Sequence, residues 1–123
     1  MSLAHLTLGT VAVERTARFL ERTLGYTRDE TPANSPTETV WLATGGGQQL
    51  HIVYVEGFAV SPFEGEFGRH IAVFHPAQEL AALRERLVSE GAQVMQPLRP
   101  SVHERFFFRE PVNGYVFEVI AAP

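Results

Sequence analysis

The spacing of hydrophobic residues changes near the start of the chain, from a period of two to a helical period. Apolar side chains take every second position over residues 3–8, and His5 and Thr7 lie between them. This alternation is typical of a strand with one buried face. Over residues 13–24 the apolar positions recur at helical spacing, and Gly25 stands where a helix commonly ends. We therefore expect a strand followed by a helix.

Three shorter strands follow in the first half of the chain. The pattern predicts them over residues 26–30, 37–43 and 48–55, with a proline-containing loop at 32–36. The last two strands are joined by a Thr-Gly-Gly-Gly segment, which is typical of a hairpin turn. An irregular segment over residues 56–68 then leads to the middle of the chain.

The second half of the chain repeats this order of elements. We expect a strand, then a helix opened by Pro76 and closed by Gly91, and then three more strands. The expected strands span residues 68–75, 92–96, 104–110 and 115–120.

Equivalent residues in the two halves are separated by a nearly constant distance along the chain. The pairs, 65 to 67 positions apart, are His5 and His70, Gly25 and Gly91, and His51 and Glu118. A constant period of this length indicates two copies of one unit. We predict an α+β fold in which two βαβββ modules, residues 1–60 and 67–123 approximately, form a cupped mixed sheet in a single domain of residues 1–123.

Four residues form a candidate metal site. They lie on predicted strands, two in each module, on the face opposite the larger apolar side chains: His5, His51, His70 and Glu118. Three imidazoles and one carboxylate suit Fe(II), Mn(II), Ni(II), Co(II) or Zn(II), and two histidines with one carboxylate are the set found in non-haem Fe(II) oxygenases. The alternative is that the histidines are hydrogen-bonded residues of a sheet and that Glu118 is an edge charge.

Three further side chains are weaker candidates. His103 precedes a strand and is either a second acid or base on a closing loop or a surface histidine. Arg105 and Arg109 flank three phenylalanines, and either meet an anionic substrate or are solvated edge charges. Another histidine, His75, precedes the second helix and is expected to be structural.

Composition limits the partners and the type of site. With 123 residues, 45% of them hydrophobic and 20% charged, the chain has the length and balance of one globular domain. A net charge of −4 argues against nucleic acid or an anionic membrane as a partner. The chain has no cysteine, so a metal site has to use histidine and carboxylate ligands. Because we see neither cysteine nor a signal-peptide pattern, we expect a cytoplasmic protein.

Four short segments resemble the vicinal oxygen chelate superfamily, which includes glyoxalase I, bleomycin-resistance proteins, fosfomycin-resistance enzymes, extradiol dioxygenases and methylmalonyl-CoA epimerase. The segments are residues 4–6, 50–52, 68–72 and 111–118. The last is similar to the family's Asp-Pro-x-Gly-x-x-x-Glu ending, with Glu110 in place of the aspartate and one extra residue before the glycine. The resemblance covers nearly the whole chain and implies the glyoxalase/bleomycin resistance/dioxygenase fold.

The resemblance also implies roles for the four candidate residues. His5, His70 and Glu118 match positions that bind a divalent transition metal in most metal-dependent members. His51 matches the fourth position, which is glutamate in bacterial glyoxalase I, glutamine in the epimerase and not a ligand in the dioxygenases. Single-domain members usually form homodimers, so His5 and His51 of one subunit are expected to join His70 and Glu118 of the other.

Two classes of function follow from this resemblance. The first is a metal-dependent lyase, isomerase or dioxygenase that acts on a small molecule bound through vicinal oxygens, with Glu118 as the candidate general base. The second is a metal-free protein of the bleomycin-resistance kind that binds a small molecule. The four ligand positions favour the enzyme.

Overall fold

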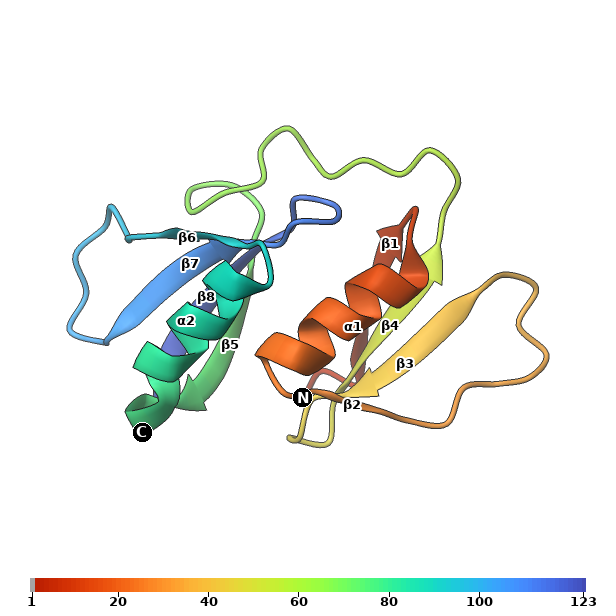
Figure 1. Cartoon of the computed structure of the whole chain (residues 1–123), viewed down its shortest axis with the longest axis horizontal. Coiled ribbons are helices and arrows are strands. Elements are labelled where there is room, and N and C mark those ends of the chain that lie inside the picture. The colour runs from red at the N-terminus through yellow and green to blue at the C-terminus, as the bar shows by residue number, and fades with distance from the viewer. Residues whose placement is uncertain (1) are drawn as a thin grey trace. The chain divides into compact units, whose positions relative to one another are not determined.

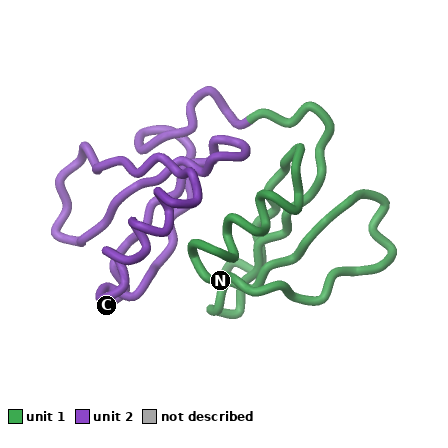
Figure 2. The backbone as a smooth tube through the Cα atoms, in the orientation of Figure 1, with its two compact units in different colours: residues 1–59 green, residues 60–123 purple. Residues whose placement is uncertain are grey.

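The computed structural model describes residues 2–123, and the chain divides into two compact units (Figure 2). Unit 1 comprises residues 1–59, and unit 2 comprises residues 60–123. Each unit is described by itself. The expected module boundaries fall close to this division, and the single-domain organisation stays a prediction.

Unit 1 is a four-stranded mixed sheet with one helix (Figure 1). Its elements are β1 (His5–Thr10), α1 (Val13–Thr23), β2 (Thr27–Arg28), β3 (Thr39–Ala43) and β4 (Gln49–Tyr54). The strand order is β1-β4-β3-β2, with β1 parallel to β4 and the remaining pairs antiparallel.

Helix α1 packs on β3 and β4 and covers one face of this sheet. Leu42, Leu50 and Ile52 point from the strands into the resulting core, where Ala17 and Leu20 of the helix meet them. The expected alternation is thus realised, because the larger apolar side chains face the helix and the neighbouring positions face away. The other face of the sheet carries the candidate histidines.

Unit 2 has the same order of elements. They are β5 (Ile71–Pro76), the short 3-10 helix η1 (Ala77–Glu79), α2 (Leu80–Ser89), β6 (Gln93–Met95), β7 (Arg105–Arg109) and β8 (Val116–Ala122). The strand order is β5-β8-β7-β6, again with a parallel first pair and antiparallel remaining pairs. Two mixed sheets of identical topology confirm the predicted α+β fold built from two βαβββ modules.

The helix ends agree with the sequence patterns, and two boundaries differ. Gly25 and Gly91 follow the helices with φ of 78° and 93°, the left-handed backbone that favours glycine. Pro76 ends β5 and precedes the 3-10 turn rather than opening the α-helix directly. His70, expected on a strand, lies just before β5, because residues 63–69 form a tight loop with a bridge between Glu64 and Arg69.

Gly68 in this loop meets the backbone closely. A Cβ atom built at Gly68 would overlap the carbonyl group of Phe63, whose oxygen accepts a hydrogen bond of 3.0 Å from the N–H of Arg69. The N–H of Gly65 in turn donates to the carbonyl of Arg69 at 3.0 Å. This compact loop determines where the backbone of His70 lies before β5 begins.

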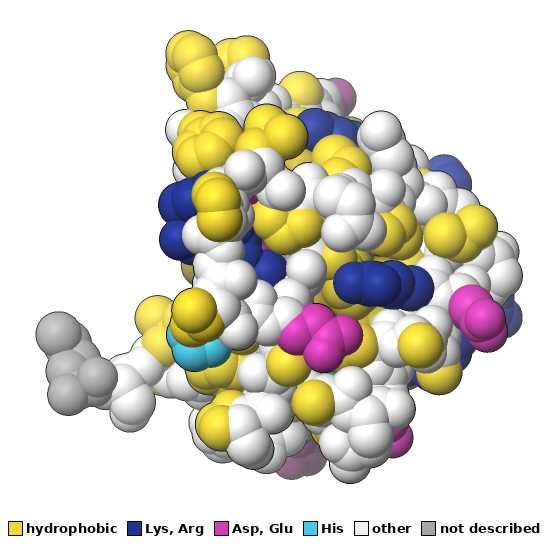
Figure 3. Space-filling model, turned by 90° about the vertical axis from the view of Figure 1, so that its left-hand side faces the viewer, with side chains coloured by type: hydrophobic (Ala, Val, Ile, Leu, Met, Phe, Trp, Pro, Cys, Tyr) yellow, Lys and Arg dark blue, Asp and Glu magenta, His cyan; other side chains and the backbone are white. Residues whose placement is uncertain are grey.

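Two surface features complete the description of the chain. Within residues 2–123, no helix has the length and apolar character needed to cross a membrane. On the face drawn in Figure 3, acidic and basic side chains are interspersed with hydrophobic ones.

Candidate metal centre

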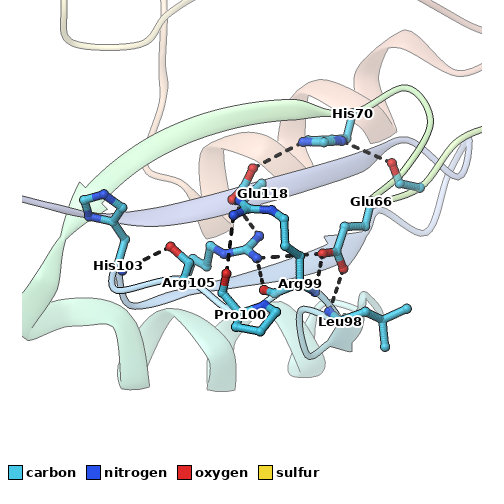
Figure 4. A network of polar contacts seen from close by, with 10 residues as sticks. Glu66, His70, Leu98, Arg99, Pro100, His103, Arg105 and Glu118 are labelled. Atoms are coloured by element: carbon cyan, nitrogen blue, oxygen red, sulfur yellow. Dashed lines mark hydrogen bonds and ion pairs between the residues drawn. The ribbon is translucent and has the colours of Figure 1, made fainter.

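In unit 2 the candidate ligands His70 and Glu118 face one another (Figure 4). Glu118 lies on β8 opposite Ala72 of β5, so the residue two positions before Ala72 reaches the same face of the sheet. The distance from His70 Nε2 to Glu118 Oε1 is 3.2 Å. Phe107 is the cross-strand neighbour of Glu118, and its ring meets that of His70 edge-on with the ring centres 5.2 Å apart.

The hydrogen bond of the second ring nitrogen of His70 determines which nitrogen carries the proton. Nδ1 lies 3.1 Å from the carbonyl oxygen of Gly65, which can only accept, so Nδ1 carries a proton. In the neutral ring Nε2 then presents its lone pair to the carboxylate of Glu118. Two acceptor atoms at this distance need a cation or a proton between them, and a histidine that donates its other N–H to a backbone carbonyl is the usual form of a metal ligand. The donor set therefore fits a divalent transition metal.

Glu118 is also held from its other side. Arg105 Nη1 donates to Oε2 of Glu118 at 3.0 Å, and the side chain of Arg105 is only 4% exposed. Arg105 Nη2 donates to the carbonyl of Arg99 and lies 3.7 Å from Glu66 Oε2. Arg105 was expected to contact a substrate or to be a solvated edge charge. In the structure it is buried and forms an internal ion pair with Glu118.

Glu66 ties the loop before β7 to this network (Figure 4). Its two carboxylate oxygens accept the backbone N–H groups of Leu98 and Arg99 at 2.8 and 2.9 Å. These hydrogen bonds, that of Leu98 first, hold the pKa of Glu66 below its ordinary value. The carboxylate thus stays ionised beside the guanidinium of Arg105.

Glu110 organises the turn that leads into β8. Although it is almost fully buried, its carboxylate accepts three backbone N–H groups, from Val112 at 2.7 Å, Asn113 at 2.8 Å and Tyr115 at 3.2 Å. Buried polar groups are stable when they are hydrogen-bonded in this way. This explains the acidic residue at the start of the terminal motif, because the turn sets where β8 begins and hence where Glu118 lies.

A second buried carboxylate supports the start of the same strand. Glu64 Oε1 accepts the backbone N–H of Val116 at 2.9 Å and pairs with Arg69 at 2.8 Å. Arg109, expected to meet an anion or solvent, donates instead to the carbonyl oxygens of Gly114 and Glu64, at 3.0 and 3.5 Å.

In unit 1 the candidate ligands are part of a stack of rings. His51 on β4 lies opposite Trp41 of β3 in the sheet, and their ring centres are 3.9 Å apart with planes 1° from parallel. On the other side the ring of His5 stacks on His51 at 4.0 Å with an angle of 13°. His51 is buried between its neighbours, whereas His5 is exposed at the beginning of β1.

A chain of hydrogen bonds orients His51. Its Nε2 lies 2.9 Å from Gln49 Oε1, and the amide nitrogen of Gln49 donates to Asp29 Oδ2 at 2.8 Å. Because Asp29 accepts from the amide nitrogen, the amide oxygen faces His51, and Nε2 is the protonated nitrogen. Burial lowers the pKa of His51, and the neighbouring His5 lowers it further. The ring is therefore neutral near pH 7, with Nδ1 as its acceptor.

The stacked geometry limits how this pair can bind one ion. Nitrogen lone pairs lie in the ring plane, so those of His5 and His51 lie in two nearly parallel planes and do not converge on one point. Binding of one ion by both rings requires one of them to turn about its side-chain bonds. His5 can turn because it is exposed, whereas His51 is held by Trp41 and Gln49.

A cavity of about 420 Å³ adjoins His51. It is bounded by the sheet and by the loop before β3, through Pro32, Asn34, Ser35, Pro36, Thr39, Trp41, His51 and Val53. Trp41 therefore forms part of the wall of this cavity.

The four predicted ligands come together as two pairs, one in each unit. Among residues 2–123, no three histidine, aspartate or glutamate side chains gather closely enough to hold a metal ion. The complete set of His5, His51, His70 and Glu118 stays a prediction. His103 lies on an exposed turn, where its backbone N–H donates a hydrogen bond of 3.1 Å to Oγ of Ser101.

Sequence reasoning missed the residues that support the ligands. The alternation of a strand puts Gln49 on the same face as His51, but Asp29, its hydrogen-bond partner in a separate segment, gives no signal in the sequence. Glu66 and Arg105 belong to an irregular segment and a strand whose register the sequence does not specify. A register for β7 against β8 would have placed Arg105 diagonally across from Glu118.

Comparison with known families supplies the decisive observation. The sequence model of the Glyoxalase/Bleomycin resistance protein/Dioxygenase superfamily matches residues 2–119. The chain belongs to this superfamily. The comparison with curated protein sequences found no match.

Solved structures of superfamily proteins share the fold. The fosfomycin resistance protein FosX from Listeria monocytogenes matches with a TM-score of 0.78 and 21% identity over 99% of this chain and 91% of its own. FosX from Mesorhizobium loti gives 0.75 and 22%, over 99% and 92%. A putative glyoxalase family protein from Bacillus anthracis gives 0.78 and 18%, over 100% and 96%. A mutant of the Listeria protein was crystallised with Mn(II) and 1S,2S-dihydroxypropylphosphonic acid.

Proposed function

We propose that this chain is a metal-dependent enzyme, a lyase, isomerase or dioxygenase, that acts on a small molecule bound through two vicinal oxygens. The observation that carries the proposal is the pair of His70 Nε2 and Glu118 Oε1, 3.2 Å apart, with His70 Nδ1 bound to a backbone carbonyl. Superfamily membership and the Mn(II) complex of the Listeria relative support a divalent metal. We expect the enzyme to work in the cytoplasm.

The proposed ligands are His5, His51, His70 and Glu118. A divalent metal bound there supplies a Lewis acid that polarises the substrate oxygens. Arg105 fixes Glu118 through Oε2 and leaves Oε1 to the metal or to a proton. Glu118 is also the candidate general base, and it would take up a proton at Oε1 only when that oxygen is not bound to the metal.

We further propose that the ligands come from two copies of the chain. Each unit supplies only two of the four ligands, so a site needs one pair of each kind. In a homodimer with two-fold symmetry, His5 and His51 of one subunit join His70 and Glu118 of the other, and the dimer carries two such sites.

The alternative function is binding of a small molecule without a metal. The cavity of about 420 Å³ beside His51 supports it, because its proline and aromatic walls can hold an organic ring without any ion. The enzyme is favoured because nothing in that alternative requires His70 and Glu118 to face one another.

Elemental analysis of the purified protein tests the metal, with His70→Ala as the variant and His103→Ala as the matched control. About one transition metal per chain, lost in His70→Ala and kept in His103→Ala, is the expected result. Circular dichroism establishes that both variants are folded. If the wild-type protein binds none of Fe(II), Mn(II), Ni(II), Co(II) and Zn(II) after reconstitution, the proposed metal-dependent enzyme is wrong. The metal-free binding protein is then the remaining function.

Mixing two variants tests the origin of the ligands. One variant carries His5→Ala and His51→Ala, and the other carries His70→Ala and Glu118→Gln. After the mixture is unfolded and refolded, half of the dimers combine the two variants, and one of their two sites has all four ligands. The mixture should therefore bind about a quarter of the wild-type metal per chain. Ligands drawn from a single chain would leave the mixture as empty as its components.

A further inference from the structure

A second cavity lies beside Glu118 within unit 2 and has a volume of about 280 Å³. Its floor consists of Met95, Phe107 and Val116, which share the face of the sheet that carries Glu118. Phe107 is paired with Glu118 on one side and with Met95 on the other, and Val116 is two residues before Glu118. The cavity therefore lies on the same face of the sheet as Glu118, with Phe107 as their common neighbour.

The walls of this cavity come from two loops. Gly65 and Glu66 line it on one side, and Gln96 and Leu98 line it on the other. The hydrogen bonds of Glu66 to the backbone of Leu98 and Arg99 join these two walls. The same contacts occupy the carboxylate, so its oxygens are not free to bind a ligand.

The charges around the cavity decide what it can hold. Arg105, the nearest buried cation, is committed to Glu118, to the carbonyl of Arg99 and to Glu66. No cationic side chain lines the cavity among the residues that the structure describes. An anionic group in the cavity would find no cationic side chain to pair with and would lie near the carboxylate of Glu66. The loss of its hydration would therefore disfavour binding.

We infer that this cavity binds an uncharged apolar substituent of the substrate, while the oxygens of the same molecule bind at His70 and Glu118. This inference rests on the proposed function and narrows its substrate to molecules with a chelating head and an apolar group. A cavity of about 150 Å³ holds a benzene ring. The cavity beside Glu118 accordingly has room for one ring or an alkyl chain of about six carbons.

Hydroxamates test the inference, because they chelate a metal through two vicinal oxygens and can carry any substituent. We would titrate Mn(II)-loaded protein by calorimetry with the series from acetohydroxamate to octanohydroxamate. Since each buried methylene contributes ~0.8 kcal/mol, affinity should rise about fourfold per added methylene until the cavity is full. A pentanohydroxamate with a terminal carboxylate should gain nothing over acetohydroxamate.

Three variants separate the cavity from the metal. Met95→Trp fills the cavity and should abolish the gain with chain length while leaving acetohydroxamate binding unchanged. Leu98→Ser removes an exposed apolar wall without disturbing the core and should reduce octanohydroxamate affinity at least threefold. Val88→Trp, on the exposed side of α2, is the matched control and should keep the wild-type series.

A measurement on the metal-free protein tests the cavity independently of the proposed function. Benzyl alcohol, added during nuclear magnetic resonance measurements, should shift the signals of Met95, Phe107 and Val116 in the wild type, whereas those of Phe107 and Val116 should stay unchanged in Met95→Trp. A metal-loaded protein that binds acetohydroxamate but gains nothing with chain length overturns the inference alone. Failure to bind any metal overturns the proposed function, and absence of benzyl alcohol shifts then overturns the cavity as well.

Discussion

The two units share a topology but hold their candidate ligands by different physical means. In unit 1, His51 is a neutral ring held by stacking on Trp41 and by the amide of Gln49, and its partner His5 is exposed. In unit 2, Glu118 is a buried charge balanced by Arg105. An aromatic stack costs little to disturb, whereas a buried ion pair is costly to break. The comparison predicts that unit 2 governs stability and that unit 1 adjusts the site.

The largest effect is expected for Glu118→Ala. This change leaves the guanidinium of Arg105 buried without its nearest carboxylate, and removal of one member of a buried pair typically costs about 3–5 kcal/mol in the free energy of unfolding. Urea denaturation should show a loss near 3 kcal/mol, because Glu66 remains 3.7 Å from Arg105. His51→Ala, the unit 1 counterpart, should cost about 1 kcal/mol.

A second substitution checks the cause of that loss. The double variant Glu118→Ala with Arg105→Met removes both charges and should recover most of the lost stability, because an apolar side chain tolerates this burial. A double variant as unstable as Glu118→Ala would attribute the loss to packing rather than to the unpaired charge. Equal losses in His51→Ala and Glu118→Ala would break the comparison between the units.

The next largest effect is expected at the turns before the last strand of each unit. In unit 2, Glu110→Ala leaves three backbone N–H groups without their acceptor, and we expect a loss of about 2 kcal/mol in the free energy of unfolding. In unit 1, Thr44 makes its side-chain hydrogen bond in an exposed turn, so Thr44→Ala should cost no more than about 0.5 kcal/mol. Denaturation of both variants measures the difference, and similar losses would contradict it.

An effect on metal affinity rather than on stability is expected in unit 1. Gln49→Ala removes the acceptor that orients His51 and should weaken metal binding about 10- to 100-fold. Because Gln49 is on the surface of the sheet, its free energy of unfolding should change by no more than about 0.5 kcal/mol. Competition with a chelator measures the affinity, and Gln48→Ala, an exposed neighbour, is the control. An unchanged affinity would remove His51 from the ligand set.

The smallest effect concerns pH and compares Thr10 with His75, which lie at equivalent positions of the repeat, Thr10 as the last residue of β1 and His75 as the last but one of β5. Thr10 is buried and bonded to Thr16, whereas Nε2 of His75 is buried without a hydrogen-bond partner. Burial lowers the pKa of His75, while Glu79 opposes and Arg86 adds to the shift. The unfolded chain then binds a proton at higher pH than the folded chain, so stability falls as pH drops through about 6.5.

Replacement of His75 tests this pH dependence. His75→Gln should flatten the decline of the midpoint of urea denaturation between about pH 7 and pH 5, because this contribution to proton uptake on unfolding is removed. His103→Gln, at an exposed position, should leave the decline unchanged. The same slope in His75→Gln and wild type would show that other groups cause the decline.

The repeat and the faces of the strands could be predicted from sequence because both depend on local periodicity. The alternation around His51 and Glu118 indicated which side chains face the core, and the structure confirms that Ile52 and Phe117 are buried. The start of β5 was placed too early, because the close contact of Gly68 with Phe63 involves backbone groups that a hydropathy pattern does not describe.

The charges around the ligands could not be predicted in this way. In the sequence, Arg105 is an ordinary charged residue that precedes three phenylalanines. Its burial depends on the register of β7 against β8 and on the loop whose Arg99 carbonyl accepts its hydrogen bond. Such contacts join segments far apart in the chain, as Asp29 does with Gln49. Local patterns identify the residues that can bind a metal, but they do not identify the residues that hold these ligands in place.

Gly68 makes the loop before His70 a sensitive marker for recognising related chains. Its φ is not in the left-handed region, so glycine is required there by the carbonyl of Phe63 and not by backbone conformation. A chain that places its histidine by the same loop should therefore retain glycine two positions earlier, even where the surrounding residues have diverged. Gly-x-His before a strand then becomes a testable signature, and a chain lacking that glycine should start the strand from a different backbone path.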